Sequence, residues 1–144
     1  MPKIQLSKPK DGVLYTVIFS DPDAPSTTDH KFGEWLHYRV VNCPVAADGT
    51  VGLAEGDATV AYVGPAPGEG SGKHRYTIVV YEQAAKIDED GDTISASSGF
   101  PPRRSFNSSK YAEERSLTAV AAVRFLAEYD DSVPEAHRKL KGEE

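Results

Sequence analysis

Four short apolar stretches, rich in β-branched and aromatic residues, set the strongest limit on what this chain can fold into. They are "VLYTVIFS" (13–20), "EWLHYRVVN" (34–42), "ATVAYVG" (58–64) and "HRYTIVVYEQ" (74–83). Each is short for a helix, and turn formers such as Gly, Pro and Asp separate most of them. Most are joined without a helical segment, so the pattern predicts a mainly β fold with antiparallel strands.

A fifth stretch, "TAVAAVRFLAEY" (118–129), allows two interpretations. Its alanines favour a helix by propensity. With a period of two, however, its odd-numbered residues form one apolar face and its even-numbered residues form a mixed, half-polar face. That alternation is typical of a half-buried strand, and we predict a strand here.

Two helices are expected after the fourth strand. "SSKYAEERS" predicts a short helix near 108–115, with Ser108 or Ser109 as its cap. "VPEAHRKLK" predicts a C-terminal helix near 133–141, with Pro134 in its first turn. The polar segment 84–105 is expected to be a long surface loop. Its acidic run "DEDGD" lacks the Gly and the Glu that a calcium loop needs, so we expect a solvated loop.

Composition narrows the class of protein. The chain has 144 residues, which fits one domain over 1–144, and its formal net charge is −6. An acidic chain of this kind is not expected to bind nucleic acid, and it disfavours general attraction to anionic membranes. No stretch approaches the roughly 20 apolar residues of a membrane span, and the N-terminus has no apolar core of a signal peptide, so we expect a cytoplasmic protein. Cys43 is the only cysteine, which excludes an intrachain disulfide.

Three polar motifs stand beside the predicted strands. "DPDAPS" (21–26) follows the first strand, and it packs two carboxylates and two prolines into one turn. "GEWLHYR" places Trp35 and His37 two residues apart, and "GPAPGEGSGKHRY" does the same for His74 and Tyr76. Residues two apart on a strand point to the same face. If the three strand ends meet, Asp21 and these side chains line one pocket.

Such a pocket suits an anion. Two imidazoles offer N–H donors, Tyr76 offers its hydroxyl, and Asp21 is placed to fix the tautomer of one imidazole. Each motif also has an ordinary explanation, since Asp-Pro pairs form turns and a single strand His is commonly a packed core or edge residue. A metal site built from His37, His74 and Asp21, and a hydrolase of phosphate or acyl esters with His37 or His74 as general base, remain open.

Together the motifs resemble those of the phosphatidylethanolamine-binding protein family, which includes the Raf kinase inhibitor protein and the plant florigens. The resemblance rests on "DPDAPS", "GEWLHYRVVN" and "YVGPAPGEGSGKHRYTIVVYEQ", and "SGFPPRRSFNSSKYAEERSL" and "EYDDSVPEAHRKL" continue it over roughly residues 13 to 140. It implies an antiparallel β-sandwich with an anion pocket at one end and a C-terminal helix beside it. By motif position, the implied lining is Asp21, Pro25, Trp35, His37, Pro67, His74 and Tyr76.

The resemblance also implies a function. Proteins of this family accept phosphate-like groups, including phospholipid head groups, so we expect a non-enzymatic, cofactor-free binding module that regulates a kinase or protease partner. His137 stands where animal relatives carry a Tyr, which would add a titratable group if it faces the pocket. Only about a dozen residues precede the first strand, whereas longer members begin with more strands. An unpaired sheet edge would invite weak dimerisation, so we expect a monomer or a weak homodimer.

Overall fold

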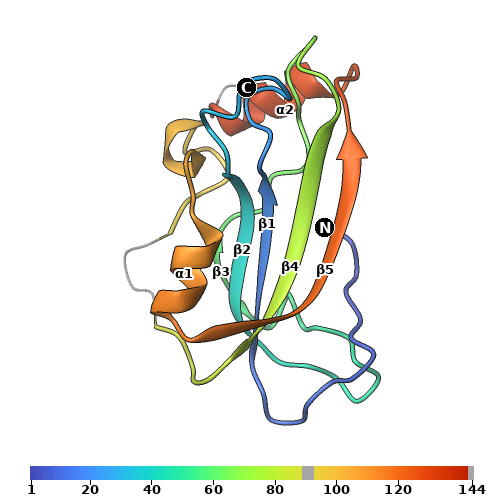
Figure 1. Cartoon of the computed structure of the whole chain (residues 1–144), viewed down its shortest axis with the longest axis vertical. Coiled ribbons are helices and arrows are strands. Elements are labelled where there is room, and N and C mark those ends of the chain that lie inside the picture. The colour runs from blue at the N-terminus through green and yellow to red at the C-terminus, as the bar shows by residue number, and fades with distance from the viewer. Residues whose placement is uncertain (89–92, 143–144) are drawn as a thin grey trace.

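A five-stranded antiparallel sheet forms the frame of the molecule, as seen in a computed structural model that describes residues 1–88 and 93–142 (Figure 1). In spatial order its strands are β3 (Asp57–Val60), β2 (Trp35–Cys43), β1 (Tyr15–Asp21), β4 (His74–Gln83) and β5 (Leu117–Ala127). The predicted mainly β, antiparallel fold is confirmed. "Sandwich" describes it loosely, because all named strands of the described residues belong to one sheet. The residues 89–92 of the acidic run lie outside the described ranges.

The core lies on both faces of β1. All seven residues of this strand are buried, because β2 and β4 flank its edges and packed side chains cover its faces. Val17 and Phe19 belong to one hydrophobic cluster, whereas Ile18 belongs to another. The second cluster includes Tyr111 and Ala112, so it lies between the sheet and the helix that carries them.

Three helical segments follow β4. A 3-10 turn, η1 (Pro101–Arg103), precedes α1 (Ser108–Glu114), and α2 (Val133–Leu140) lies across one end of the sheet (Figure 1). The two predicted α-helices are therefore present. The cap of α1 is Asn107, whose side chain accepts from the Lys110 amide, and not Ser108 or Ser109. Among the described residues, no helix is long and apolar enough to cross a membrane.

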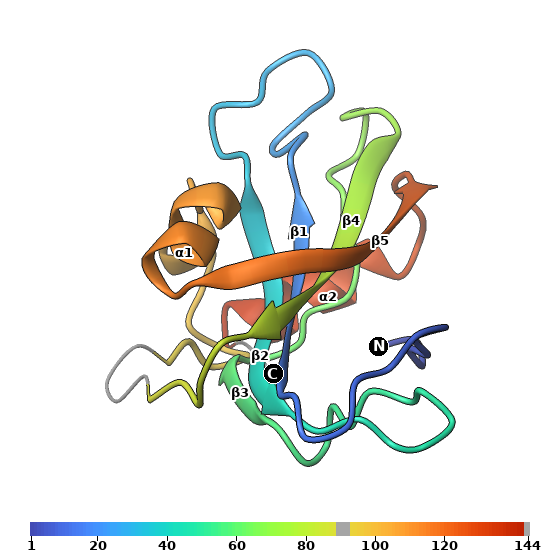
Figure 2. The ribbon, with the colours of Figure 1, turned by 60° about the horizontal axis from the view of Figure 1, so that its bottom comes forward.

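The strand over 117–127 is confirmed, but its environment differs from the half-buried one expected. β5 continues directly from α1 and forms an edge of the sheet beside β4 (Figure 2). Residues 118–126 are all exposed, including Val123 at 55% and Leu126 at 60%. The physical reason is position, since an edge strand has only one neighbour and the side chains of its middle part lie largely open to solvent. The expected weak dimerisation stays a prediction.

The third predicted strand is shorter than expected. β3 ends at Val60, but the chain stays beside β2 as far as Val63, whose amide donates to the His37 carbonyl. The Ala61 amide donates to the Ile94 carbonyl. The residues after Val63 then continue to the end of the sheet where α2 lies, and the Ala66 carbonyl accepts from His137 there.

A buried polar network ties the opposite end together around Gln83. Its Oε1 accepts from the Thr16 hydroxyl (2.8 Å) and from the backbone N–H of Asn42 (2.7 Å). Its Nε2 donates to Asn42 Oδ1 (2.9 Å) and to the Ala85 carbonyl (3.1 Å). The amide side chain thus serves β1, β2 and the start of the following loop at once. Such a network stabilises only while every member has its partner.

Gln83→Leu is therefore expected to lower the free energy of unfolding by about 2–4 kcal/mol, because the buried Thr16 hydroxyl and the buried backbone N–H of Asn42 lose their acceptor. Urea denaturation followed by circular dichroism measures this loss. The same substitution at the exposed Gln5 is the matched control, and it should change stability by about 0.5 kcal/mol or less. Equal effects at the two positions would contradict the role given to Gln83.

Candidate functional site

β1 ends where β2 and β4 begin, and α2 lies next to this end of the sheet (Figure 1). Polar side chains gather there. A cavity of about 270 Å³ lies there. All eight residues predicted from the sequence line it: Asp21, Pro25, Trp35, His37, Pro67, His74, Tyr76 and His137. The sequence did not single out Phe32, Phe100 and Arg104, which also contribute to the lining. That these residues bind a ligand stays a prediction.

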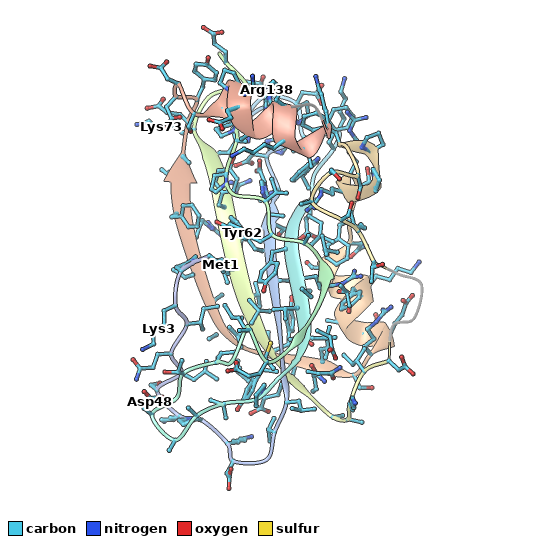
Figure 3. The ribbon with its side chains drawn as sticks, turned by 180° about the vertical axis from the view of Figure 1, so that it is seen from behind. Met1, Lys3, Asp48, Tyr62, Lys73 and Arg138 are labelled. Atoms are coloured by element: carbon cyan, nitrogen blue, oxygen red, sulfur yellow. The ribbon has the colours of Figure 1, made fainter. Side chains whose placement is uncertain are left out.

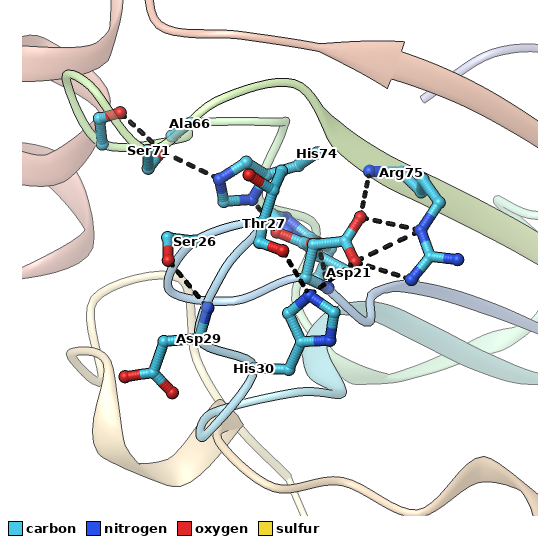
Figure 4. Close-up of polar contacts among 12 residues, drawn as sticks. Asp21, Ser26, Thr27, Asp29, His30, Ala66, Ser71, His74 and Arg75 are labelled. Atoms are coloured by element: carbon cyan, nitrogen blue, oxygen red, sulfur yellow. Dashed lines mark hydrogen bonds and ion pairs between the residues drawn. The ribbon is translucent and has the colours of Figure 1, made fainter.

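Three polar side chains form a hydrogen-bonded chain, and two of them, Asp21 and His74, line the cavity. The Nδ1 atom of His74 lies 2.6 Å from Asp21 Oδ2, and Nε2 of the same ring lies 2.8 Å from the Ser71 hydroxyl (Figure 4). Asp21 and His74 are both almost fully buried. The other carboxylate oxygen of Asp21 accepts from the Asp23 amide at 2.8 Å, which fixes the acid in place. Asp21 therefore orients an imidazole, as its position in the turn suggested.

The protons of this chain can be assigned from its partners. The Ser71 hydroxyl lies 2.6 Å from the Gly68 carbonyl, which can only accept, so the single hydroxyl proton points there. Ser71 must then accept from His74, and Nε2 of that ring carries a proton. Nδ1 of the same ring faces the Asp21 carboxylate at 2.6 Å. In this arrangement His74 is a donor toward Ser71, and both of its ring nitrogens are engaged.

His37 differs from this pattern. Its Nδ1 lies 2.8 Å from the carbonyl of Val63, so Nδ1 carries the proton and donates it. Burial lowers the pKa of His37 to about 4, against the opposing effects of the hydrogen bond to Val63 and of the Asp21 charge. The ring is neutral at neutral pH, and its Nε2 has a lone pair. The expectation that both pocket imidazoles offer N–H donors therefore does not hold for His37, whose free ring nitrogen, Nε2, is an acceptor.

Tyr76 and His137 complete the polar lining. Burial raises the pKa of Tyr76, so its hydroxyl keeps its proton and remains a donor. The Tyr76 ring stacks on Phe125 with centroids 5.5 Å apart. His137 reaches from α2 to the Ala66 carbonyl, to which its Nε2–H donates at 2.8 Å, and its ring meets Phe100 edge-on. His137 is therefore a half-buried wall residue, and not a freely solvated one.

The second carboxylate of the acidic turn has a different task. Asp23 is buried outside the cavity lining and binds the Arg75 guanidinium through both oxygens, at 2.7 and 2.9 Å. His30 approaches the same carboxylate at 3.3 Å. The Arg75 hydrogen bonds hold the pKa of Asp23 below its usual value. One carboxylate of the turn thus orients His74, and the other fastens the turn to β4.

Sequence reasoning missed Arg103, the largest fully buried side chain of the described residues. Its two terminal nitrogens donate to four carbonyls, those of Leu36, His37, Ala61 and Ser95, at 3.0–3.2 Å. Its Nε has no partner. Burial lowers the pKa of Arg103 to about 10, which still leaves the side chain charged at neutral pH. The "PPRR" run indicates a short turn but does not tell which arginine points inward.

A metal centre finds no support at this site. Within residues 1–88 and 93–142, no group of three or more His, Cys, Asp or Glu side chains is placed to hold a metal ion. Both ring nitrogens of His74 are already engaged, and so is each carboxylate oxygen of Asp21.

Comparison with known proteins agrees with the sequence motifs. The sequence profile of the phosphatidylethanolamine-binding protein family matches residues 1–126. The carboxypeptidase Y inhibitor of Saccharomyces cerevisiae is 33% identical over 148 residues, covering 89% of this chain and 65% of the inhibitor. A MOTHER of FT and TFL1 homolog of Oryza sativa subsp. japonica is 40% identical over 112 residues, covering 76% of this chain and 57% of that protein. The chain thus matches less than two thirds of each of these two relatives.

Solved structures give the same result for the fold. The crystal structure of the carboxypeptidase Y inhibitor complexed with its cognate proteinase matches with a TM-score of 0.68 at 30% identity, over 87% of this chain and 64% of that one. A phosphatidylethanolamine-binding protein from Plasmodium vivax matches with a TM-score of 0.65 over 89% of this chain and 71% of that one. At 18% identity, the second match shows a similar fold and nothing about function.

The lowered pKa of His37 has a consequence for stability. Between about pH 6.5 and pH 4 the unfolded ring binds a proton and the folded ring does not, so the unfolded state is favoured as the pH falls. We expect this residue alone to remove about 3 kcal/mol of stability across that window. Urea denaturation of the wild type and of His37→Gln at several pH values isolates the effect. Parallel stability profiles for the two proteins would show that His37 is not held neutral.

Proposed function

The chain belongs to the phosphatidylethanolamine-binding protein family, and from this premise we propose that its cavity binds phosphate-bearing ligands and that the protein regulates a partner protein by binding. Phospholipid head groups and small phosphate esters share the chemistry that the cavity would recognise. The proposal treats the protein as a binding module, and a regulatory role follows by analogy with a relative that is named as an inhibitor.

The observation that carries the proposal is the buried charge of Arg103. This guanidinium donates to the backbone of His37 and lies 5.5 Å from the Trp35 ring centre, and both residues line the cavity. In the described part of the chain, Arg103 forms no ion pair with a carboxylate. A buried cation is costly without a counter-charge. An anion in the cavity would supply that charge.

Two further groups favour a phosphate at the cavity mouth. Arg104 lines the cavity from its exposed side, with its guanidinium 3.9 Å above the Phe32 ring centre. Tyr76 offers a neutral hydroxyl as a donor. The volume of about 270 Å³ is at the lower limit for small-molecule sites (roughly 300–1,000 Å³), which suits a head group rather than a whole lipid.

Binding is favoured over hydrolysis by the state of the Ser71–His74–Asp21 chain. A serine nucleophile needs a base that accepts its proton. Here the Ser71 hydroxyl donates to Gly68, and His74 donates to Ser71. His37 is neutral but has no hydroxyl or thiol within hydrogen-bond distance among the described residues. The ester-hydrolase alternative therefore lacks an activated nucleophile.

Titration with O-phosphorylethanolamine, followed by the NMR signals of the histidine rings, tests the ligand. The signals of His37 and His74 should shift together and saturate. Arg104→Gln should weaken binding about three- to fivefold, because an exposed cation contributes a small but measurable part of the binding free energy. Arg138→Gln removes the same charge from α2, at the same end of the molecule but outside the lining, and should bind like the wild type (Figure 3). Unmoved ring signals at millimolar ligand would contradict the site.

The class of partner needs a separate test. A relative has been solved in complex with its cognate proteinase, which favours a protease over a kinase as the first partner to try. We expect this chain to reduce carboxypeptidase Y activity in a concentration-dependent way. A steady-state peptidase assay with the purified chain, and with bovine serum albumin as a protein control, measures it. Full peptidase activity at a large excess of the chain would exclude this partner and leave the phosphate site unaffected.

A further inference from the structure

Most hydrogen-bonding atoms of the cavity wall are already in use. The two ring nitrogens of His74 serve Asp21 and Ser71, and the two oxygens of Asp21 serve His74 and the Asp23 amide. Nε2 of His137 donates to the Ala66 carbonyl. A ligand that enters the cavity therefore meets few free groups, and the chemistry of those few decides what binds.

Nε2 of His37 is one of these free atoms. The opposite ring nitrogen donates to the Val63 carbonyl, so Nε2 has a lone pair and no proton. Among the described residues no hydrogen-bond donor bonds to it, and it is not one of the buried atoms cut off from solvent. His37 lines the cavity, so its unused nitrogen is open to a ligand. A ligand that bonds to this nitrogen must therefore supply a hydrogen-bond donor.

We propose that His37 makes the cavity select phosphate groups that carry a hydrogen, that is, the monoanion of a phosphate monoester. The P–OH group would donate to Nε2 of His37, while the charged oxygens face Arg104 of the lining and are attracted by the buried charge of Arg103 behind the wall. A phosphodiester or a sulfate ester has the same negative charge but no such hydrogen. Its oxygen lone pairs would face the lone pair of His37. This inference rests on the proposed phosphate-binding function and narrows its ligand class.

The surroundings of His37 keep it an acceptor. The rings of Trp35, Phe19 and Tyr76 pack around it, with centroids 4.5, 4.9 and 5.3 Å away. These neighbours exclude the water that a charged imidazole needs. The nearby Arg103 charge also lowers the pKa of His37, so protonation of the ring is disfavoured by both solvation and repulsion. It is therefore the ligand that must bring the proton.

Other titratable and charged groups face His37 from each neighbouring element and affect how binding depends on pH. They are Asp21 of β1, His74 and Tyr76 of β4, Arg103 of η1, Arg104 directly after it, and His137 of α2. A matched pair of ligands removes their contribution. Methyl phosphate loses its hydrogen above its second pKa, about 6, whereas dimethyl phosphate keeps one negative charge and no hydrogen throughout. A change in the protonation of the protein affects the binding of both ligands. The ratio of the two affinities therefore follows the hydrogen that only methyl phosphate can carry.

Isothermal titration of the wild-type chain with methyl phosphate, dimethyl phosphate and methyl sulfate tests the inference. At pH 6, methyl phosphate should bind at least tenfold more tightly than the other two, because a site built around an acceptor rejects a ligand that lacks the donor. Its advantage over dimethyl phosphate should fall by about fiftyfold between pH 6 and pH 8, following the loss of the monoanion. Equal binding of all three, or a ratio that does not change with pH, would overturn the inference.

The outcomes separate this inference from the function on which it rests. If all three ligands bind equally, the anion site stands and the selectivity fails. If none binds, the proposed function fails and the selectivity with it. Isothermal titration with O-phosphorylethanolamine and with glycerophosphoethanolamine then separates the two sources of phosphate. The first ligand is a monoester, and the second has the phosphodiester of a lipid head group. Preference for the first supports the inference, and equal affinity overturns it.

His37→Phe assigns the selectivity to this residue. The variant keeps a ring of similar size but removes the acceptor, so the affinity ratio of methyl to dimethyl phosphate should approach 1 at every pH. Thermal melting shows whether the variant folds, because the Val63 carbonyl loses its donor. Should it not fold, the wild-type ratios still decide the inference. The matched control is His30→Phe, whose ring is outside the cavity lining and which should keep the wild-type ratio.

Discussion

The architecture of the cavity end depends on how the sparsely paired edge of β2 obtains its hydrogen bonds. β3 pairs with β2 only from Arg39 to Val41, and before Arg39 the His37 carbonyl accepts from the Val63 amide. Arg103 supplements this sparse pairing, since its guanidinium donates to the carbonyls of Leu36, His37, Ala61 and Ser95. Three segments far apart in the sequence are joined at one point. The result is a fixed wall with a positive charge inside it.

At the other side of the cavity, buried polar side chains of the acidic turn likewise join segments that are far apart in sequence. Its two carboxylates are two residues apart in sequence but have separate partners, His74 for Asp21 and Arg75 for Asp23. Because those partners are consecutive residues of β4, the turn is fixed to that strand at two points. A buried acid is stable only with such partners. The site is therefore stiff on the sides formed by β2 and β4.

Much of this was predictable from the sequence, and the remainder has a physical explanation. Strand β4 was predicted at its observed bounds, and the period of two correctly placed His37 with Trp35 and His74 with Tyr76 on a shared side. The donor or acceptor state of a ring was not predictable, because it depends on carbonyls brought near by folding: that of Val63, 26 residues from His37, and that of Gly68 through Ser71. The exposure of β5 was not predictable either, since an apolar alternation does not say whether a neighbour covers it.

The position of Trp35 gives the molecule a built-in optical probe. It is the only tryptophan of the chain, it lines the cavity, and its ring lies 4.5 Å from that of His37. Intrinsic tryptophan fluorescence therefore comes from the cavity wall and from no other part of the protein. Emission wavelength and intensity report the polarity of that one place, so the filling, drying or opening of the cavity can be followed in solution without attaching a dye.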